Sequence, residues 1–358
     1  MNNQYEVFTE VTPFYSDMLE TLIQAEHKIS MMYFTYDCGI WTKKMNEIMY
    51  KKIDQGVDVR IMVDLLGIFT DNPKNIFNNI VHLTEMNNKG IQVDFFQPSK
   101  GSNMSPADRL HFKLCAIDEN VAYFGGSNIG DHYTTWQDTN LRVQGEIGEI
   151  GHQLYEYVLG HSLGSHDVPE IDLDDLMIGD AKVLLTVPGA RKDISEHWLD
   201  LIKTSENKVY FRNWYFLPNK EFMKAMLEKL DNGLNIEVLL SHRTKVRVID
   251  VANHSQCLKL VKVGANIHRY QKRYMHSKVT WNAKNDVLFG SANLEEKALK
   301  GNFELCLRFK DKRVAEELTK SYENDVRDSV HQTTKVVEQR GFPKRMASSI
   351  LSMATPLL

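Results

Sequence analysis

Hydrophobic and polar positions alternate along the chain in a way that predicts helices and strands in turn. In the first half, an amphipathic stretch at 16–29 leads into the apolar run 30–36, and a helix-like stretch at 41–56 ends at a glycine. Two further apolar runs, at 57–64 and 91–97, are separated by another helical stretch. Strands that alternate with helices are typical of βαβ units, so we predict an α/β fold with mainly parallel, mixed sheets flanked by helices.

The second half of the chain repeats this order. An amphipathic stretch at 195–209 precedes the apolar run 210–216, a helix at 220–233 and a strand at 235–240. A last helix then leads to the strand 265–271. Self-similarity of this kind indicates an internal duplication, in which each copy forms one supersecondary unit of the same type.

The duplication divides the chain into four predicted parts. Residues 1–160 and 181–330 form two domains of one fold, and the segment 161–180, rich in Gly, Asp and Pro without periodicity, connects them. In the tail 331–358, three basic residues precede a short run with apolar positions, a pattern that suits an interfacial anchor on an anionic leaflet. A terminal helix packed on its own domain is the alternative for this tail.

The same short motif closes each half. The segment 111–128 begins with His-x-Lys and ends in GGSN, and 276–293 begins with His-x-Lys and ends in GSAN. In a strand, residues two apart point the same way, so histidine and lysine share one face, and the glycine-rich turn brings asparagine beside the lysine. The repeated residues are His111, Lys113 and Asn128 in the first half and His276, Lys278 and Asn293 in the second.

An imidazole, an ammonium and an amide that converge can bind and attack a phosphate. Lysine binds a phosphate oxygen, asparagine donates hydrogen bonds, and imidazole attacks phosphorus or transfers a proton near neutral pH. One such set makes half of a phosphoryl-transfer site, and two facing sets supply a nucleophile on one side and an acid on the other. Because two lysines and two amides carry the charge, we expect neither a metal nor a cofactor.

The duplicated motifs resemble the HKD motifs of the phospholipase D superfamily. The resemblance implies two duplicated phospholipase D-like α-β-α domains related by a pseudo-two-fold axis. It implies these catalytic residues: His111, Lys113, Asp118, Asp138, His276, Lys278 and Glu304. It implies these substrate-binding residues: Gly126, Ser127, Asn128, Ser291 and Asn293.

In that superfamily the aspartate of the motif is largely structural, and a carboxylate further downstream orients each histidine. Asp138 follows His111 by twenty-seven positions and Glu304 follows His276 by twenty-eight, where such carboxylates are expected. Ala283 replaces the motif aspartate in the second half. We expect this replacement to affect stability or turn geometry rather than chemistry, with Asp286 as its substitute. Decay of the second-half chemistry is the alternative.

Further stretches resemble the bacterial cardiolipin synthase family. They are FGGSNIGDHYTTWQD at 124–138 and the terminal ATPLL. The resemblance implies a metal-independent phosphatidyltransferase that converts two phosphatidylglycerol molecules into cardiolipin and glycerol through a phosphatidyl-histidine, with His111 as nucleophile and His276 as acid. The membrane spans of many members are missing from the sequence, so we expect a peripheral protein on the cytoplasmic face of the bacterial cell membrane. EEKALKGNFE at 295–304 departs from the family's usual arginine-serine and leaves the acceptor open.

Charge and composition restrict the partners. The 358 residues include 43 basic and 47 acidic side chains, for a net charge of −4, whereas a chain that holds nucleic acid by its phosphates is usually basic. We therefore expect phosphatidylglycerol and an anionic membrane surface as partners, and no nucleic acid. Three alternatives remain at this point: a hydrolytic phospholipase D, a phosphodiesterase nuclease, and a membrane-binding module without activity. An insertion at 99–108 precedes the first motif and is a candidate lid. The sequence sets no oligomeric state.

Overall fold

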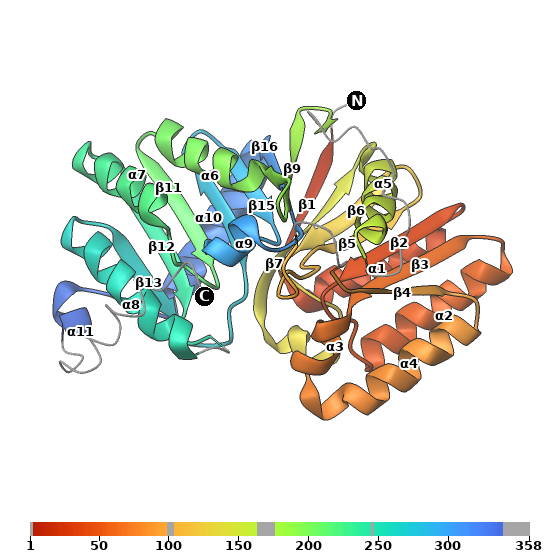
Figure 1. Cartoon of the computed structure of the whole chain (residues 1–358). Coiled ribbons are helices and arrows are strands. Elements are labelled where there is room, and N and C mark those ends of the chain that lie inside the picture. Colours follow the sequence, from red (N-terminus) through yellow and green to blue (C-terminus); the bar gives the residue numbers. More distant parts are fainter. Residues whose placement is uncertain (1–2, 99–103, 163–175, 245–246, 339–358) are drawn as a thin grey trace.

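Two mixed β-sheets, one in each half of the chain, form the frame of the protein (Figure 1). The structure, a computed structural model, describes residues 3–98, 104–162, 176–244 and 247–338. The sheets lie side by side and each carries helices on its outer face (Figure 1). Parts of the predicted insertion, connection and tail, at 99–103, 163–175 and 339–358, lie outside the described residues.

The sheet of the first half has the strand order β1-β7-β6-β5-β2-β3-β4. Its strands are β1 (Gln4–Glu10), β2 (Lys28–Tyr33), β3 (Asp58–Asp64), β4 (Gln92–Phe96), β5 (Lys113–Ile117), β6 (Val121–Gly125) and β7 (Gln137–Gln144). β2, β3 and β4 run parallel, and the remaining neighbours are antiparallel.

The sheet of the second half has the order β10-β9-β16-β15-β14-β11-β12-β13-β17, with β8 paired to β9. Its strands are β8 (Met177–Ile178), β9 (Ala181–Val187), β10 (Arg191–Lys192), β11 (Lys208–Asn213), β12 (Asn235–Ser241), β13 (Asn266–Tyr270), β14 (Lys278–Asn282), β15 (Asp286–Gly290), β16 (Glu304–Lys310) and β17 (Ser329–His331). The run β16-β15-β14-β11-β12-β13 repeats the run β7-β6-β5-β2-β3-β4. The predicted duplicated α/β fold is therefore confirmed.

The prediction of mainly parallel sheets is wrong. Among the named strands of the described ranges, parallel pairs occur in β2–β3–β4 and β11–β12–β13, and the other strand pairs of both sheets are antiparallel. The strands that carry the lysines enter hairpins whose turns span only 118–120 and 283–285. A connection this short joins antiparallel strands only, because a parallel neighbour requires a crossover of a dozen residues or more.

Helices cover both faces of the sheets because each presents an apolar stripe to them. In α1, for example, Phe14, Met18 and Leu22 recur every four residues and are buried. The helical elements are α1 (Val11–Gln24), α2 (Ile40–Asp54), α3 (Leu65–Thr70), η1 (Pro73–Asn75), α4 (Ile76–Asn88), η2 (Asp131–Thr135), α5 (Ile147–Gly160), α6 (Asp193–Thr204), α7 (Lys220–Asp231), α8 (Arg247–Lys262), α9 (Glu296–Lys300), α10 (Lys312–Arg327) and α11 (Thr334–Glu338). The outer faces of the sheets are covered by α1, α2, α4, α6, α7 and α8, whereas α5 and α10 pack against the core between the halves. None of the helices in the described ranges is long and apolar enough to cross a bilayer.

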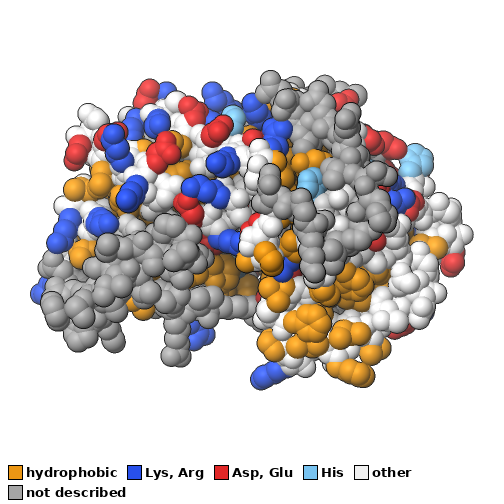
Figure 2. Space-filling view, viewed as in Figure 1, with side chains coloured by type: hydrophobic (Ala, Val, Ile, Leu, Met, Phe, Trp, Pro, Cys, Tyr) orange, Lys and Arg blue, Asp and Glu red, His pale blue; other side chains and the backbone are white. Residues whose placement is uncertain are grey.

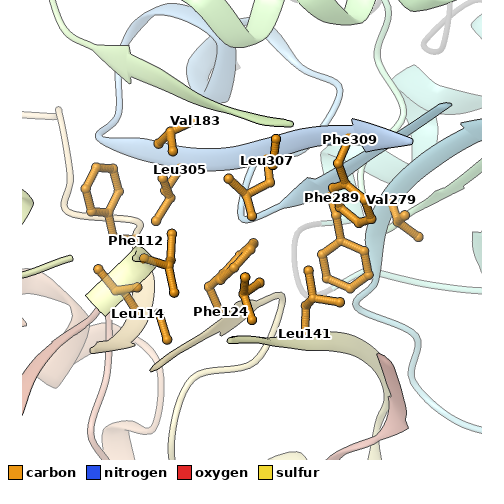
Figure 3. Packing of buried hydrophobic residues seen from close by; sticks show 14 of the residues in the cluster. Phe112, Leu114, Phe124, Leu141, Val183, Val279, Phe289, Leu305, Leu307 and Phe309 are labelled. Atoms are coloured by element: carbon orange, nitrogen blue, oxygen red, sulfur yellow. The ribbon is translucent and has the colours of Figure 1, made fainter. Parts of the chain in front are cut away.

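A shared hydrophobic core joins the two halves. Phe112, Leu114 and Phe124 of the first half face Phe289 and Leu305 of the second (Figure 3). The rings of Phe124 and Phe289 meet edge to face at 6.4 Å between centroids. Apolar burial of this kind is the main force that holds two packed layers together. It fixes the positions of β5 and β14, the two strands that begin with the motif lysines.

Candidate active site

Backbone pairing across the two halves positions both motif histidines. His111 donates its backbone N–H to the carbonyl oxygen of Phe303 at 3.0 Å, and His276 donates to Gln137 at 2.8 Å. Phe303 directly precedes Glu304, and Gln137 directly precedes Asp138. Each histidine therefore lies beside the first residues of a strand from the opposite half.

The carboxylates are exchanged between the halves. Nδ1 of His111 lies 2.8 Å from Oε1 of Glu304, which belongs to the second half. Nδ1 of His276 lies 2.9 Å from Oδ2 of Asp138, which belongs to the first half. The sequence places Asp138 downstream of His111, but an assignment of carboxylates within each half is wrong. The two halves pack face to face, so the carboxylate at the start of β7 or β16 reaches the histidine of the other half.

Both lysines are buried beside the histidine of their own motif. Nζ of Lys113 donates to the carbonyl oxygen of His111 at 2.9 Å, and Nζ of Lys278 donates to that of His276 at 2.5 Å. Burial lowers the pKa of Lys113 to about 8 and that of Lys278 to about 7. Two buried ammonium groups without full charge compensation favour a bound anion.

Burial also keeps both imidazoles neutral. It lowers the pKa of His111 well below the ordinary value, and the charges of Lys113 and Lys278 add to the effect. The pKa of His276 falls to about 3, first by burial and then through Lys278, although Asp138 opposes the shift. Since the lysine of each half acts on the histidine of the other half, the four side chains form one electrostatic unit.

The two carboxylates differ in their protonation. Burial alone raises the pKa of Asp138, but the neighbouring His276 and Lys278 outweigh this effect and hold the pKa below its ordinary value. Burial raises the pKa of Glu304 to about 8, only partly offset by Lys113. Asp138 is thus ionised at neutral pH, whereas burial favours the protonated form of Glu304.

Ser127, Ser291 and Gly126, predicted as substrate-binding residues, lie around the carboxylates. The hydroxyl of Ser127 donates to Oδ2 of Asp138 at 3.0 Å, and that of Ser291 donates to Oε2 of Glu304 at 2.5 Å. A Cβ atom on Gly126 would overlap Oδ1 of Asp138, so only glycine allows this close approach. In this structure the three residues position the carboxylates.

The two motif asparagines have different surroundings. Asn128 donates from Nδ2 to the hydroxyl of Tyr133 at 3.3 Å and accepts from the backbone N–H of Thr35 at 3.4 Å. Asn293 is buried, and its Oδ1 accepts no hydrogen bond from the part of the chain that the structure describes. A buried acceptor without a donor costs free energy, and a ligand that donates a hydrogen bond to Oδ1 of Asn293 would remove this cost.

Asp118, which the resemblance places among the catalytic residues, lies away from both histidines. It has a positive φ of 47° in the turn after β5. Its carboxylate accepts hydrogen bonds from the backbone N–H groups of Glu26, His27 and Lys28 at 2.9, 2.8 and 2.9 Å. Asp118 therefore holds the start of β2 at the end of the sheet remote from Lys113, and its role is structural.

The corresponding turn of the second half does not use a substitute carboxylate. Ala283 donates its N–H to Lys208 at 3.0 Å, as Asp118 does to Lys28 at 2.8 Å. Asp286 instead pairs with Arg308 at 2.8 Å, so the expectation that Asp286 replaces the missing acid is wrong.

Two aromatic rings beside the histidines were not predicted from the sequence as part of the site. Phe34 and Trp214 each follow the first parallel strand of their half, β2 or β11. The ring of Phe34 lies 5.9 Å from that of His111, and Trp214 lies 4.5 Å from His276. An aromatic residue at the same repeat position in both halves is the signal that could have found them.

Asp64 also contributes to the site, although it was not predicted from the sequence. This buried residue ends β3, accepts from the N–H of Leu110 at 2.9 Å and pairs with Arg109 at 3.1 Å. It thereby holds the segment that precedes His111. No group of three or more His, Cys, Asp and Glu side chains in the described ranges is arranged to hold a metal ion.

Comparison with known proteins identifies the family to which the chain belongs. The family described as cardiolipin synthase, phospholipase D-like domain, matches residues 18–157 and 198–326, so that each match contains one histidine motif. The chain belongs to the cardiolipin synthase family of the phospholipase D superfamily.

Individual relatives agree with this membership. Cardiolipin synthase 1 of Staphylococcus epidermidis is 25% identical over 375 residues, which cover 100% of this chain and 74% of the relative. A probable cardiolipin synthase of Bacillus subtilis is 24% identical over 96% of this chain and 70% of the relative. Among solved structures, phosphatidylserine synthase of Haemophilus influenzae has the same fold, with a TM-score of 0.78 at 11% identity over 99% of this chain and 95% of the other.

Proposed function

We propose that the protein is a phosphatidyltransferase that converts two phosphatidylglycerol molecules into cardiolipin and glycerol. The observation that carries the proposal is the exchange of carboxylates, His111 with Glu304 and His276 with Asp138. It supports one shared reaction centre, in which two oriented imidazoles act on one phosphodiester. Membership in the cardiolipin synthase family supports the choice of substrate.

In the first half-reaction, His111 is the nucleophile. When Glu304 is ionised and accepts a hydrogen bond from Nδ1–H of the neutral His111, the lone pair of Nε2 attacks the phosphorus of the first phosphatidylglycerol. The bond from phosphorus to the glycerol oxygen breaks, and its electron pair takes a proton from His276. Glycerol leaves, and a phosphatidyl group remains on His111. Lys113 and Lys278 stabilise the negative charge on the phosphoryl oxygens.

His276 becomes protonated when the substrate binds. In the empty site this imidazole is neutral, because burial and Lys278 lower its pKa to about 3. The phosphodiester brings a negative charge beside both lysines, which raises the pKa of the imidazole. The ionised Asp138 favours the charged form of His276 in particular, whereas Glu304 gives His111 no comparable support. This asymmetry makes His276 the acid and His111 the nucleophile.

The second half-reaction reverses these roles. His276, now neutral, takes the proton from a glycerol hydroxyl of a second phosphatidylglycerol. The resulting oxygen attacks phosphorus, and the bond from phosphorus to Nε2 of His111 breaks, so cardiolipin forms and the nucleophile is restored. Hydrolysis would use the same groups with water in place of the second lipid. The scheme requires no metal and no cofactor, because the two lysines carry the charge. We also propose that the protein acts on the anionic, cytoplasmic surface of a bacterial membrane.

Incubation of the purified protein with phosphatidylglycerol vesicles in EDTA tests the proposal. We expect cardiolipin and glycerol in equal amounts by mass spectrometry, and no product with His111→Ala or His276→Ala. His27→Ala, at a histidine far from the site with 64% of its side chain exposed, is the matched control and should be fully active. Phosphatidic acid as the main product would establish a hydrolase instead, and cleavage of single-stranded DNA would establish a nuclease.

A further inference from the structure

Large apolar side chains gather on one corner of the first half, over α3 and α4 (Figure 2). We call this corner the α3–α4 patch, and it consists of Leu66, Phe69, Phe77, Ile80 and Val81. Phe77 is 76% exposed, and the other four side chains are 43–50% exposed. Contiguous apolar surface of this kind on a soluble protein typically marks an interaction site.

The fold does not impose this apolar surface. α4 connects β3 to β4, and α8 connects β12 to β13 at the same place in the second half. The described residues of α8 include no large apolar side chain that is exposed. α11 packs against α8, whereas among the described side chains α3 and α4 leave Phe69, Phe77 and Ile80 exposed.

Charged groups around the patch fit an anionic surface. From 65 to 84, the charged residues of the sequence are Asp71 and Lys74. Asp71 is only 9% exposed on its side chain, whereas Lys74 is exposed and lies between Phe69 and Phe77 along the chain. The remaining polar positions are mainly uncharged asparagines. Along α4, the nearest exposed carboxylate is that of Glu85, one turn after Val81, and it pairs with Lys89 at 2.8 Å. Its charge is therefore offset where the patch meets an anionic headgroup.

The patch adjoins the reaction centre through α3. At the start of this helix, Asp64 binds the segment before His111, and the N–H of Gly67 donates to Asp64 at 3.0 Å. Gly67 lies so close to Phe34 that a Cβ atom would overlap the carbonyl oxygen of Phe34, whose ring contacts His111. α3 is therefore fixed to the site on its inner side and exposes Leu66 and Phe69 outward.

The end of α3 has a second connection to the site. Asp71 accepts a hydrogen bond from the hydroxyl of Tyr133, which itself accepts one from Asn128 of the first motif. A bilayer in contact with the outer face of this short helix would thus lie within one helix diameter of the side chains that surround His111.

We propose that the α3–α4 patch docks the protein on an anionic lipid surface, with Phe69, Phe77 and Ile80 inserted at the headgroup boundary and Lys74 beside the headgroups. The inference deepens the proposed function, on which the lipid substrate rests, because it assigns the route by which a headgroup reaches the site. A contact with a second copy of the chain fits less well. Five side chains at these exposures amount to a few hundred Å², whereas a standard interface buries about 800 Å² per partner.

The test combines the substitutions Phe69→Gln, Phe77→Gln and Ile80→Gln in the full chain. Glutamine is a good helix former, and the replaced side chains are exposed, so the fold is retained. Ile23→Gln is the matched control, since Ile23 is 51% exposed at the end of α1, which precedes β2 at the opposite end of the sheet. Flotation with vesicles of phosphatidylglycerol and phosphatidylcholine measures binding, and gel filtration measures the oligomeric state.

We expect the triple variant to bind vesicles at least about a hundredfold more weakly, because each inserted apolar side chain contributes roughly tenfold or more. The control should bind like the unmodified chain. Equal binding by the triple variant would overturn the inference, as would a dimer of the unmodified chain that the triple variant converts to a monomer. Short-chain phosphatidylglycerol below its micellar concentration should react equally with all three proteins. If none reacts with either form of lipid, the proposed function fails, while vesicle binding still decides the docking.

Discussion

Replacement of Asp138 by asparagine separates the two half-reactions. Asparagine keeps the shape of the side chain and an acceptor for Nδ1 of His276, but it removes the negative charge. That charge lies 2.9 Å from Nδ1, and both side chains are buried. The charged form of His276 therefore loses its main stabilising partner, and His276 can no longer act as an acid at neutral pH.

The size of the effect follows from the distance. At an effective dielectric constant of about 20, two unit charges 2.9 Å apart attract each other by about 6 kcal/mol, which corresponds to roughly four powers of ten. Proton transfer by a positioned acid contributes roughly 10² to 10⁴ in rate, and this sets the upper limit. We expect release of glycerol from phosphatidylglycerol to slow by about 10³ to 10⁴.

A substrate whose leaving group needs no proton provides the assay. With the p-nitrophenyl ester of phosphatidic acid, Asp138→Asn should still release one equivalent of p-nitrophenolate per enzyme in a rapid burst, because attack by His111 does not involve Asp138. Further turnover should then stop, because the second half-reaction needs His276 as a base. Glu304→Gln should abolish the burst itself, since Glu304 orients His111.

The opposite pattern would refute the reasoning. If each carboxylate served the histidine of its own half, Asp138→Asn would lose the burst and Glu304→Gln would keep it. Asp286→Asn is the control, because Asp286 is also buried and paired, but with Arg308. It should lower the thermal midpoint of unfolding without changing the burst or the release of glycerol.

Three further predictions concern the surroundings of the site. Asp118→Ala removes the acceptor of three backbone N–H groups and should lower the free energy of unfolding in urea by about 1–3 kcal/mol. A hundredfold loss of turnover would instead show that Asp118 is a catalytic residue. Gly126→Ala should displace Asp138 and reduce turnover about a hundredfold or more without unfolding the protein, and unchanged turnover would contradict the close approach. The pKa values of Lys113 and Lys278 are lowered to about 8 and 7, so their charged forms are lost as the pH rises. Because both charges are used, kcat/KM should decline above about pH 7, and a profile that is level up to about pH 10, where an ordinary lysine titrates, would contradict this.

The sequence predicted what depends on local patterns. The spacing from histidine to lysine to asparagine and the order of strands and helices are both local, and both appear in the structure twice. The direction of strands was misjudged because the βαβ pattern was extended to the whole sheet. The three-residue turn at 118–120 already indicated an antiparallel hairpin.

What the sequence left undetermined depends on contacts between the halves. The partner of each carboxylate is set by how the two sheets pack through residues such as Phe124 and Phe289, and apolar positions in strands do not reveal which surface they meet. The α3–α4 patch could not be predicted from the sequence for a related reason. Helical periodicity places the apolar residues Phe77 and Ile80 on one face of a helix. Whether another element covers that face is a property of the assembled molecule.

The crossed pairing of His111 and His276 with carboxylates from the opposite half has a consequence for biosynthesis. The first half leaves the ribosome with His111 in place, but the side chain of Glu304 does not exist until nearly two hundred more residues have been added. In the proposed mechanism, a nascent chain therefore carries an unoriented imidazole that is not ready to attack lipid. Under the proposed function, reactivity appears only when translation is nearly finished and the two halves have docked.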